Sequence, residues 1–107
     1  MTAADELAVL RAELDEIDDA LYDLVRRRMR CIERVGAVKA RAGIPVFQPG
    51  RAAEVERQAA ARAREHGLDE GLLVRLADLL MAEAIRIEEG IVAQPGSSAG
   101  PQNSPPT

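Results

Sequence analysis

Hydrophobic side chains recur at alternating steps of three and four residues through the first forty positions of this chain. This spacing places them on one stripe of an α-helix, because it averages close to the helical repeat of about 3.6 residues. The ten positions of the stripe, here called the seam, are Leu7, Leu10, Leu14, Ile17, Leu21, Leu24, Arg28, Cys31, Val35 and Val38. Nine of the ten suit a buried surface, and the exception is Arg28.

The seam predicts one continuous helix from about Asp5 to Arg41, which is closed by a stop signal at Gly43 and Pro45. At about 1.5 Å per residue, such a helix is about 55 Å long. A compact domain of about 100 residues has a radius of gyration of only about 13 Å. Part of the seam therefore needs cover from outside the chain's own core, and we expect a second copy of the chain to provide it.

Two shorter helices are expected after a connection over residues 42–50, which is rich in Gly and Pro. The first, over about 51–65, is rich in alanine, and the second, over about 70–92, carries a leucine and isoleucine stripe. Between them, Gly67 is placed to end one helix and Asp69 to cap the start of the next. The predicted fold is all-α, with three helices, one of them very long.

The end of the chain differs from the rest in composition. Residues 93–107 are uncharged and rich in Pro, Gly and Ser, so we expect a disordered tail that cannot bury enough apolar surface to fold. Residues 1–92 form the predicted helical domain.

Composition and charge narrow the function classes. The net charge of −4 gives no electrostatic case for binding nucleic acid, which depends on phosphate neutralisation. The single cysteine, Cys31, excludes an intrachain disulfide and a cysteine metal cluster, and no metal-ligand spacing is present. Neither a secretory signal nor an apolar run of membrane-spanning length is visible, so we expect a cytoplasmic protein without membrane contact.

Arg28 is the first candidate for chemistry, because a charge on the seam needs an anionic partner. Arg28 could pair with a local acid such as Asp23 or Glu33, or extend its charged end into solvent. Alternatively, it binds an anionic ligand held inside the helical bundle. Lys39 lies three turns beyond Arg28, about 16 Å along the axis on a similar face, so both long side chains can reach one small molecule. Arg11 lies about 25 Å before Arg28, and it can join them only from the second helix of an antiparallel pair.

The pattern of these residues resembles the AroQ class of chorismate mutases over about residues 5 to 92. The segments that carry the resemblance are Leu10-Arg11, Asp15-Glu16-Ile17-Asp18, Arg28, Val35-Gly36-Ala37-Val38-Lys39 and Arg51 after a short loop that contains proline. The resemblance implies an intertwined all-helical homodimer with two active sites, in which the first helix of each chain spans both sites.

The resemblance also implies a role for each cation. Arg11 of the partner subunit would join Arg28, Lys39 and Arg51 of this chain around a small dicarboxylate substrate. Arg11 and Arg28 would hold the two carboxylates, Lys39 would donate to the ether oxygen, and Arg51 would line the same pocket.

The sequence departs from the family where the substrate is recognised. Many bacterial members carry Asp at Gln48 and Glu at Ala52, positions that approach the C4 hydroxyl of chorismate. The segment around Gln48 and Arg51 is closer to a subgroup that acts on 4-amino-4-deoxychorismate in antibiotic pathways. Many members also carry Gln at Glu88, which would face the ether oxygen, where only a protonated carboxyl could donate. The alternative for Glu88 is a solvent-facing acid beside Glu89.

The implied reaction is a [3,3]-sigmatropic rearrangement of chorismate to prephenate, or of the 4-amino analogue. It needs no nucleophile, metal or cofactor, and it relies on holding a reactive conformer among well-placed cations. Two alternatives remain at this point. One is an isochorismate pyruvate lyase on the same fold, and the other is a non-catalytic helical dimerisation module, which would leave Arg28 unexplained.

Overall fold

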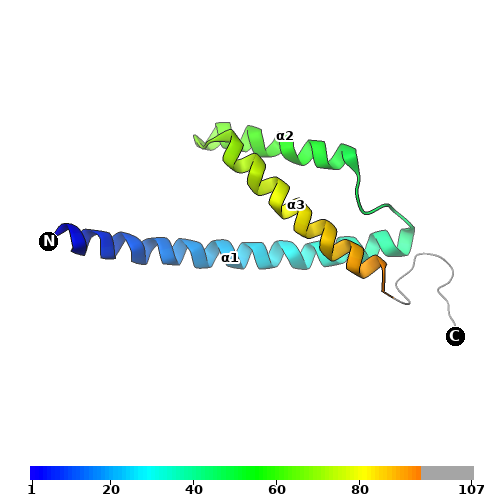
Figure 1. The fold of residues 1–107 in the computed structure, drawn as a ribbon, viewed down its shortest axis with the longest axis horizontal. Helices are drawn as coiled ribbons and strands as arrows, with labels where there is room; N and C mark the ends of the chain where they lie inside the picture. The colour runs from blue at the N-terminus through cyan, green and yellow to red at the C-terminus, as the bar shows by residue number, and fades with distance from the viewer. Residues whose placement is uncertain (95–107) are drawn as a thin grey trace. The chain divides into compact units, whose positions relative to one another are not determined.

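The computed structural model describes residues 1–94, which form three helices: α1 (Ala3–Ala42), α2 (Pro49–His66) and α3 (Glu70–Val92) (Figure 1). These residues contain no strand, so the predicted all-α fold with one very long helix is confirmed. Residues 95–107, which make up most of the expected tail, lie outside the described residues.

The start of α1 lies two residues before the expected one because Thr2 caps it. The Thr2 hydroxyl accepts a hydrogen bond from the Asp5 backbone N–H, and the Asp5 carboxylate accepts from the Thr2 backbone and hydroxyl. This reciprocal arrangement is a capping box. The bonds from Thr2 lower the pKa of Asp5, because they favour its charged form. At its other end, α1 closes at Gly43, whose φ of 69° is left-handed, with Ile44 N–H donating to the Lys39 carbonyl.

The ends of α2 and α3 follow equally local chemistry. Gln48 is the N-cap of α2 and Pro49 its first residue, so this helix also starts two residues before the expected Arg51. Gly67 ends α2 with a φ of 68°, and Leu68 N–H donates to the Ala63 carbonyl. The side chain of Asp69 accepts from Leu72 N–H, which confirms it as the cap of α3.

The chain divides into two units after Cys31, and α1 contributes to both. The first unit, residues 1–31, is helical from Ala3 on and has no core of its own. Its seam residues Leu7, Leu10, Leu14, Ile17, Leu21 and Leu24 are between 47% and 55% exposed. Such a continuous apolar face on a helix needs a partner.

The second unit begins at Ile32 and contains the last turns of α1 together with α2 and α3, which turn back on each other at residues 67–69 (Figure 1). Its core is built from small side chains. The buried residues are Gly36 and Ala40 in α1, Ala63 in α2, and Ala77, Ala84 and Glu88 in α3. No large side chain is fully buried among the described residues, so these helices are held by close backbone approach.

None of the helices in the described part of the chain is long and apolar enough to cross a membrane.

The helices α1 and α3 approach each other closely at Gly36. A Cβ added there would lie 2.9 Å from Ile91 Cδ1 and 3.4 Å from Glu88 Cα, whereas one added at Gly90 would meet nothing within 4 Å. We expect Gly36→Val to destabilise the fold by about 1–3 kcal/mol through overpacking. The matched change Gly90→Val should be neutral to within about 0.5 kcal/mol. Urea unfolding followed by circular dichroism measures both, and equal midpoints for the two variants would contradict the packing described.

A carboxyl pair across α2 and α3 predicts a pH dependence. The protonated Glu56 carboxyl donates a hydrogen bond to the Asp78 carboxylate, and this bond and the negative charge of Asp78 raise the pKa of Glu56 above its ordinary value of 4.5. The folded state therefore binds this proton more tightly than the unfolded state, and the stabilisation is lost as pH rises above about 4.5 through the raised pKa.

Asp78→Asn should raise the melting temperature at pH 7. The Asn side-chain amide can donate to the Glu56 carboxylate without any proton uptake, and it removes the repulsion between two negative charges. Its advantage should shrink as pH falls through the raised pKa of Glu56, because the protonated Glu56 of the unmodified protein then donates the hydrogen bond itself. Asp19→Asn, at an exposed acid of α1, controls for net charge. Equal changes in melting temperature for Asp78→Asn and Asp19→Asn over this pH range would contradict an interaction between Glu56 and Asp78.

Candidate active site

Lys39 joins three segments of the second unit. It lies in the last turn of α1, and its Nζ is 2.7 Å from Oε1 of Glu88 on α3. The same Nζ donates a 2.6 Å hydrogen bond to the carbonyl of Val46 in the loop before α2. The Lys39 and Glu88 side chains are only 13% and 6% exposed. Because an ammonium carries three donors, one N–H of Lys39 remains for a ligand.

Glu88 is the one acid in the described residues that is buried, so the solvent-facing alternative for it is wrong. Its Oε1 makes the close charge contact with Lys39 but has no aligned hydrogen-bond partner among the described residues. Burying an unpaired carboxylate would be very costly, and the nearby ammonium is what makes this position tolerable. A carboxylate in such a pair accepts hydrogen bonds and does not donate them.

Gly36 brings this pair together. It lies one turn before Lys39, and the space that a Cβ would occupy is bounded by Cα and Cγ of Glu88 at 3.4 Å. The backbone of α3 therefore approaches α1 at a glycine, which sets the Glu88 side chain beside Lys39. Ala40 and Ala84, both buried, keep the same contact narrow.

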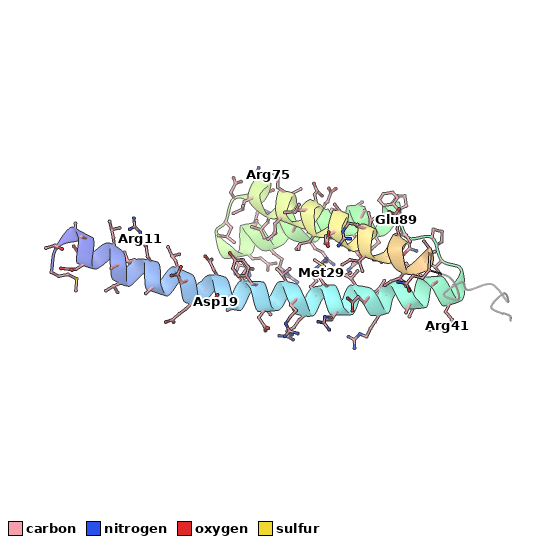
Figure 2. The ribbon with its side chains drawn as sticks, turned by 60° about the horizontal axis from the view of Figure 1, so that its bottom comes forward. Arg11, Asp19, Met29, Arg41, Arg75 and Glu89 are labelled. Carbon is pink, nitrogen blue, oxygen red and sulfur yellow. The ribbon has the colours of Figure 1, made fainter. Side chains whose placement is uncertain are left out.

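Arg28, in the first unit, makes no ion pair with an acid among the described residues. Asp23 pairs with Arg26 and not with Arg28, and Nη1 of Arg28 has no hydrogen-bond partner among the described residues. A local ion pair with Asp23 or Glu33 therefore does not account for Arg28. Arg11 is exposed and projects from the N-terminal part of α1 (Figure 2).

The two site candidates at the start of α2 are exposed. Arg51 pairs with Glu54 one turn further along α2, and surface pairs of this kind are weak enough to exchange for a ligand. The side chain of Gln48 makes no capping bond although Gln48 is the N-cap, so its amide is available. The structure brings Lys39 and Glu88 into contact, and among residues 1–94 neither forms an ion pair with Arg51.

The contact of Lys39 with Glu88 offers an ammonium donor and a carboxylate, and it does not include a nucleophile with an adjacent base. His66 lies exposed at the end of α2, and Cys31 is exposed. Within residues 1–94, no three His, Cys, Asp or Glu side chains gather to hold a metal ion. Such a site can bind an anion and stabilise negative charge that develops on an oxygen.

Sequence reasoning placed Lys39 and Glu88 in one site by resemblance, but it missed their direct pairing. The usable signal was the spacing of Ala77, Ala84 and Glu88, which share the buried face of α3. The hydrogen bond from Lys39 to Val46 had no sequence signal, because its acceptor is a backbone carbonyl.

Comparison with known proteins identifies the family of the chain. The profile of the family described as chorismate mutase type II matches residues 10–89, most of the chain and nearly all of its helices. The chain is 43% identical over 99 residues to a protein of Streptomyces venezuelae named 4-amino-4-deoxychorismate mutase, covering 92% of this chain and 96% of the relative.

Two further relatives are similar over shorter stretches. A 4-amino-4-deoxychorismate mutase of Streptomyces pristinaespiralis is 40% identical over 95 residues, which is 89% of this chain and 74% of the relative. The chorismate mutase of Methanocaldococcus jannaschii is 27% identical over 77 residues, 72% of this chain and 78% of the relative. The helical fold and these similarities together show that the chain belongs to the chorismate mutase type II family and is an isomerase of that type.

Proposed function

We propose that this protein rearranges 4-amino-4-deoxychorismate to 4-amino-4-deoxyprephenate. The observation that carries the proposal is the identity of 43% and 40% to two relatives named for that substrate, over most of the chain. The uncharged Gln48 and the small Ala52 support it, since many members of the family carry acids at these positions. Residues 1–92 would form the catalytic domain, in keeping with the family match over 10–89.

The reaction depends on holding the substrate in a reactive conformation and on stabilising negative charge at its ether oxygen. The bond between the ring C3 and the ether oxygen breaks while a bond forms between ring C1 and the enolpyruvyl methylene, so the product is an isomer. Negative charge develops on the ether oxygen during this exchange. The remaining N–H of Lys39 would donate to that oxygen from a partly desolvated site, where such a bond is strong.

The carboxylates of the substrate would be held by Arg28 and by Arg11 of the partner subunit, with Gln48 and Arg51 lining the pocket. Arginine suits this task because its planar fork can bond both oxygens of a carboxylate. The absence of a local ion pair for Arg28 supports its use by a ligand. The pairing with Lys39 supports a charged Glu88 beside the donor, in place of a protonated Glu88 acting as donor itself.

We further propose a homodimer with two shared sites. Two sets of apolar side chains support it: the exposed seam of α1, and Leu72, Leu76 and Leu79, which lie 41–69% exposed along one face of α3. With only small side chains buried among the described residues, one copy lacks the core that a domain of this size needs. A second copy would cover both surfaces and would bring Arg11 to the partner's Lys39.

The substrate proposal is tested by incubating purified protein with 4-amino-4-deoxychorismate, chorismate and isochorismate and separating the products by chromatography. We expect the highest kcat/KM with the amino compound, and an isomeric product with no released pyruvate. Release of pyruvate from isochorismate would favour the lyase alternative. No turnover of any of the three by folded protein would favour the dimerisation module.

The shared site predicts complementation between two inactive variants. Arg11→Ala and Lys39→Ala should each lower kcat/KM by two orders of magnitude or more, as expected for lost transition-state contacts. After subunit exchange, half of the dimers are mixed and one of the two sites in each is intact, so activity should recover to about a quarter of normal.

Sedimentation equilibrium provides the control for this experiment, since it reports whether each variant is dimeric. A helical monomer would contradict the dimer itself. Confirmed exchange without recovery would instead place Arg11 and Lys39 in the same chain's site or in none.

A further inference from the structure

The buried pair of Lys39 and Glu88 changes the charge that the site presents to its substrate. The ammonium and the carboxylate are 2.7 Å apart, and both side chains are largely withdrawn from solvent. Together they are neutral, so Lys39 can donate a hydrogen bond without adding a net positive charge. A site built to bind the most negative substrate would leave this lysine unneutralised.

The second observation is the state of the Glu88 carboxylate. Its Oε1 is buried, and the Lys39 ammonium lies 2.7 Å from it. The electrostatic effect of such a carboxylate is strong, because little water screens it.

The two candidate substrates differ next to the atom that Lys39 would contact. The ether oxygen is attached to ring C3, and the substituent that distinguishes them is on the neighbouring ring carbon, C4. In chorismate this substituent is a neutral hydroxyl, and in the amino analogue it is an ammonium at neutral pH. A carboxylate in contact with the lysine that donates to the ether oxygen is therefore close to the C4 group.

We infer that Glu88 is a specificity-determining residue, whose buried negative charge favours the substrate with a cationic amino group at C4 over the hydroxyl substrate. This inference rests on the proposed function, because it assumes that Lys39 contacts the ether oxygen. Glu88 acts through its charge on the substrate's ammonium, and it neither gives nor takes a proton in the reaction.

The test is the ratio of kcat/KM for 4-amino-4-deoxychorismate to kcat/KM for chorismate, measured on one preparation of each variant. The fraction of folded enzyme cancels in this ratio, so a loss of stability does not affect it. Glu88→Gln removes the charge and keeps the shape, and it should lower the ratio at least about tenfold. Glu88→Asp keeps the charge and should retain most of the ratio even where both rates fall.

Glu89→Gln is the matched control. Glu89 is the neighbouring acid on α3, it is exposed, and its side chain makes no ion pair with the described residues (Figure 2). This variant changes the net charge of the protein by the same amount and should leave the ratio unchanged.

The outcomes separate the inference from the proposed function. A lowered ratio in Glu88→Gln alone supports the specificity role. An unchanged ratio with both rates reduced overturns it, because a purely structural or hydrogen-bonding role would affect both substrates alike. An equal fall in Glu89→Gln also overturns it, since the effect would then belong to overall charge. Unmodified protein that turns over chorismate but not the amino compound contradicts the proposed function instead.

Discussion

The contact between Lys39 and Glu88 places the strongest constraint on this fold, because two charges leave water together and neither tolerates the loss of the other. Removing one partner of a buried pair leaves an uncompensated charge and typically costs about 3–5 kcal/mol. The pair also fixes position. Lys39 belongs to α1, Glu88 to α3, and Val46, which accepts a hydrogen bond from Lys39, to the loop between α1 and α2. One ammonium therefore holds two helices and a loop in register.

This contact restricts the size of the side chains that lie between α1 and α3. A lysine and a glutamate can meet over so short a distance only where the helix backbones are close, and Gly36, Ala40 and Ala84 provide that closeness. Small residues bury little apolar surface, so they contribute little to the free energy of folding. The exposed large apolar residues lie elsewhere, along the seam of α1 and on one face of α3. A tightly packed polar centre and an apolar surface that needs a partner are thus two consequences of the same packing.

Much of the fold could be predicted from the sequence because its signals are local. The end of α1 at Gly43 and the caps at Gly67 and Asp69 each depend on a few neighbouring residues, and the structure confirms all three. The starts of α1 and α2 were placed two residues late, because the Thr2 cap and Pro49 as a first helical residue were not used. The pairing of Glu88 with Lys39 was beyond local reasoning, since it depends on how α3 packs on α1. Four roles stay predictions for a related reason, because they depend on a bound substrate and on a second copy of the chain. They are the roles of Arg11, Arg28, Gln48 and Arg51.

The chemistry explains why resemblance was needed to identify the activity. Hydrolases and transferases leave a recognisable signature, because a nucleophile, its base and an oxyanion site must stand in fixed relation. A unimolecular rearrangement requires none of these, and its catalyst needs only cations and donors placed around one reactive conformer. In the sequence, such a site is a few arginines and one lysine among the fourteen basic residues of a chain with a net charge of −4. What distinguishes them is position: Arg28 interrupts the apolar seam, and Lys39 is the basic residue held by a buried acid. The two candidate substrates differ at C4 by a neutral hydroxyl or an ammonium, and a buried carboxylate beside Lys39 distinguishes such groups by charge. That is why a single buried carboxylate is the residue on which the choice of substrate should depend.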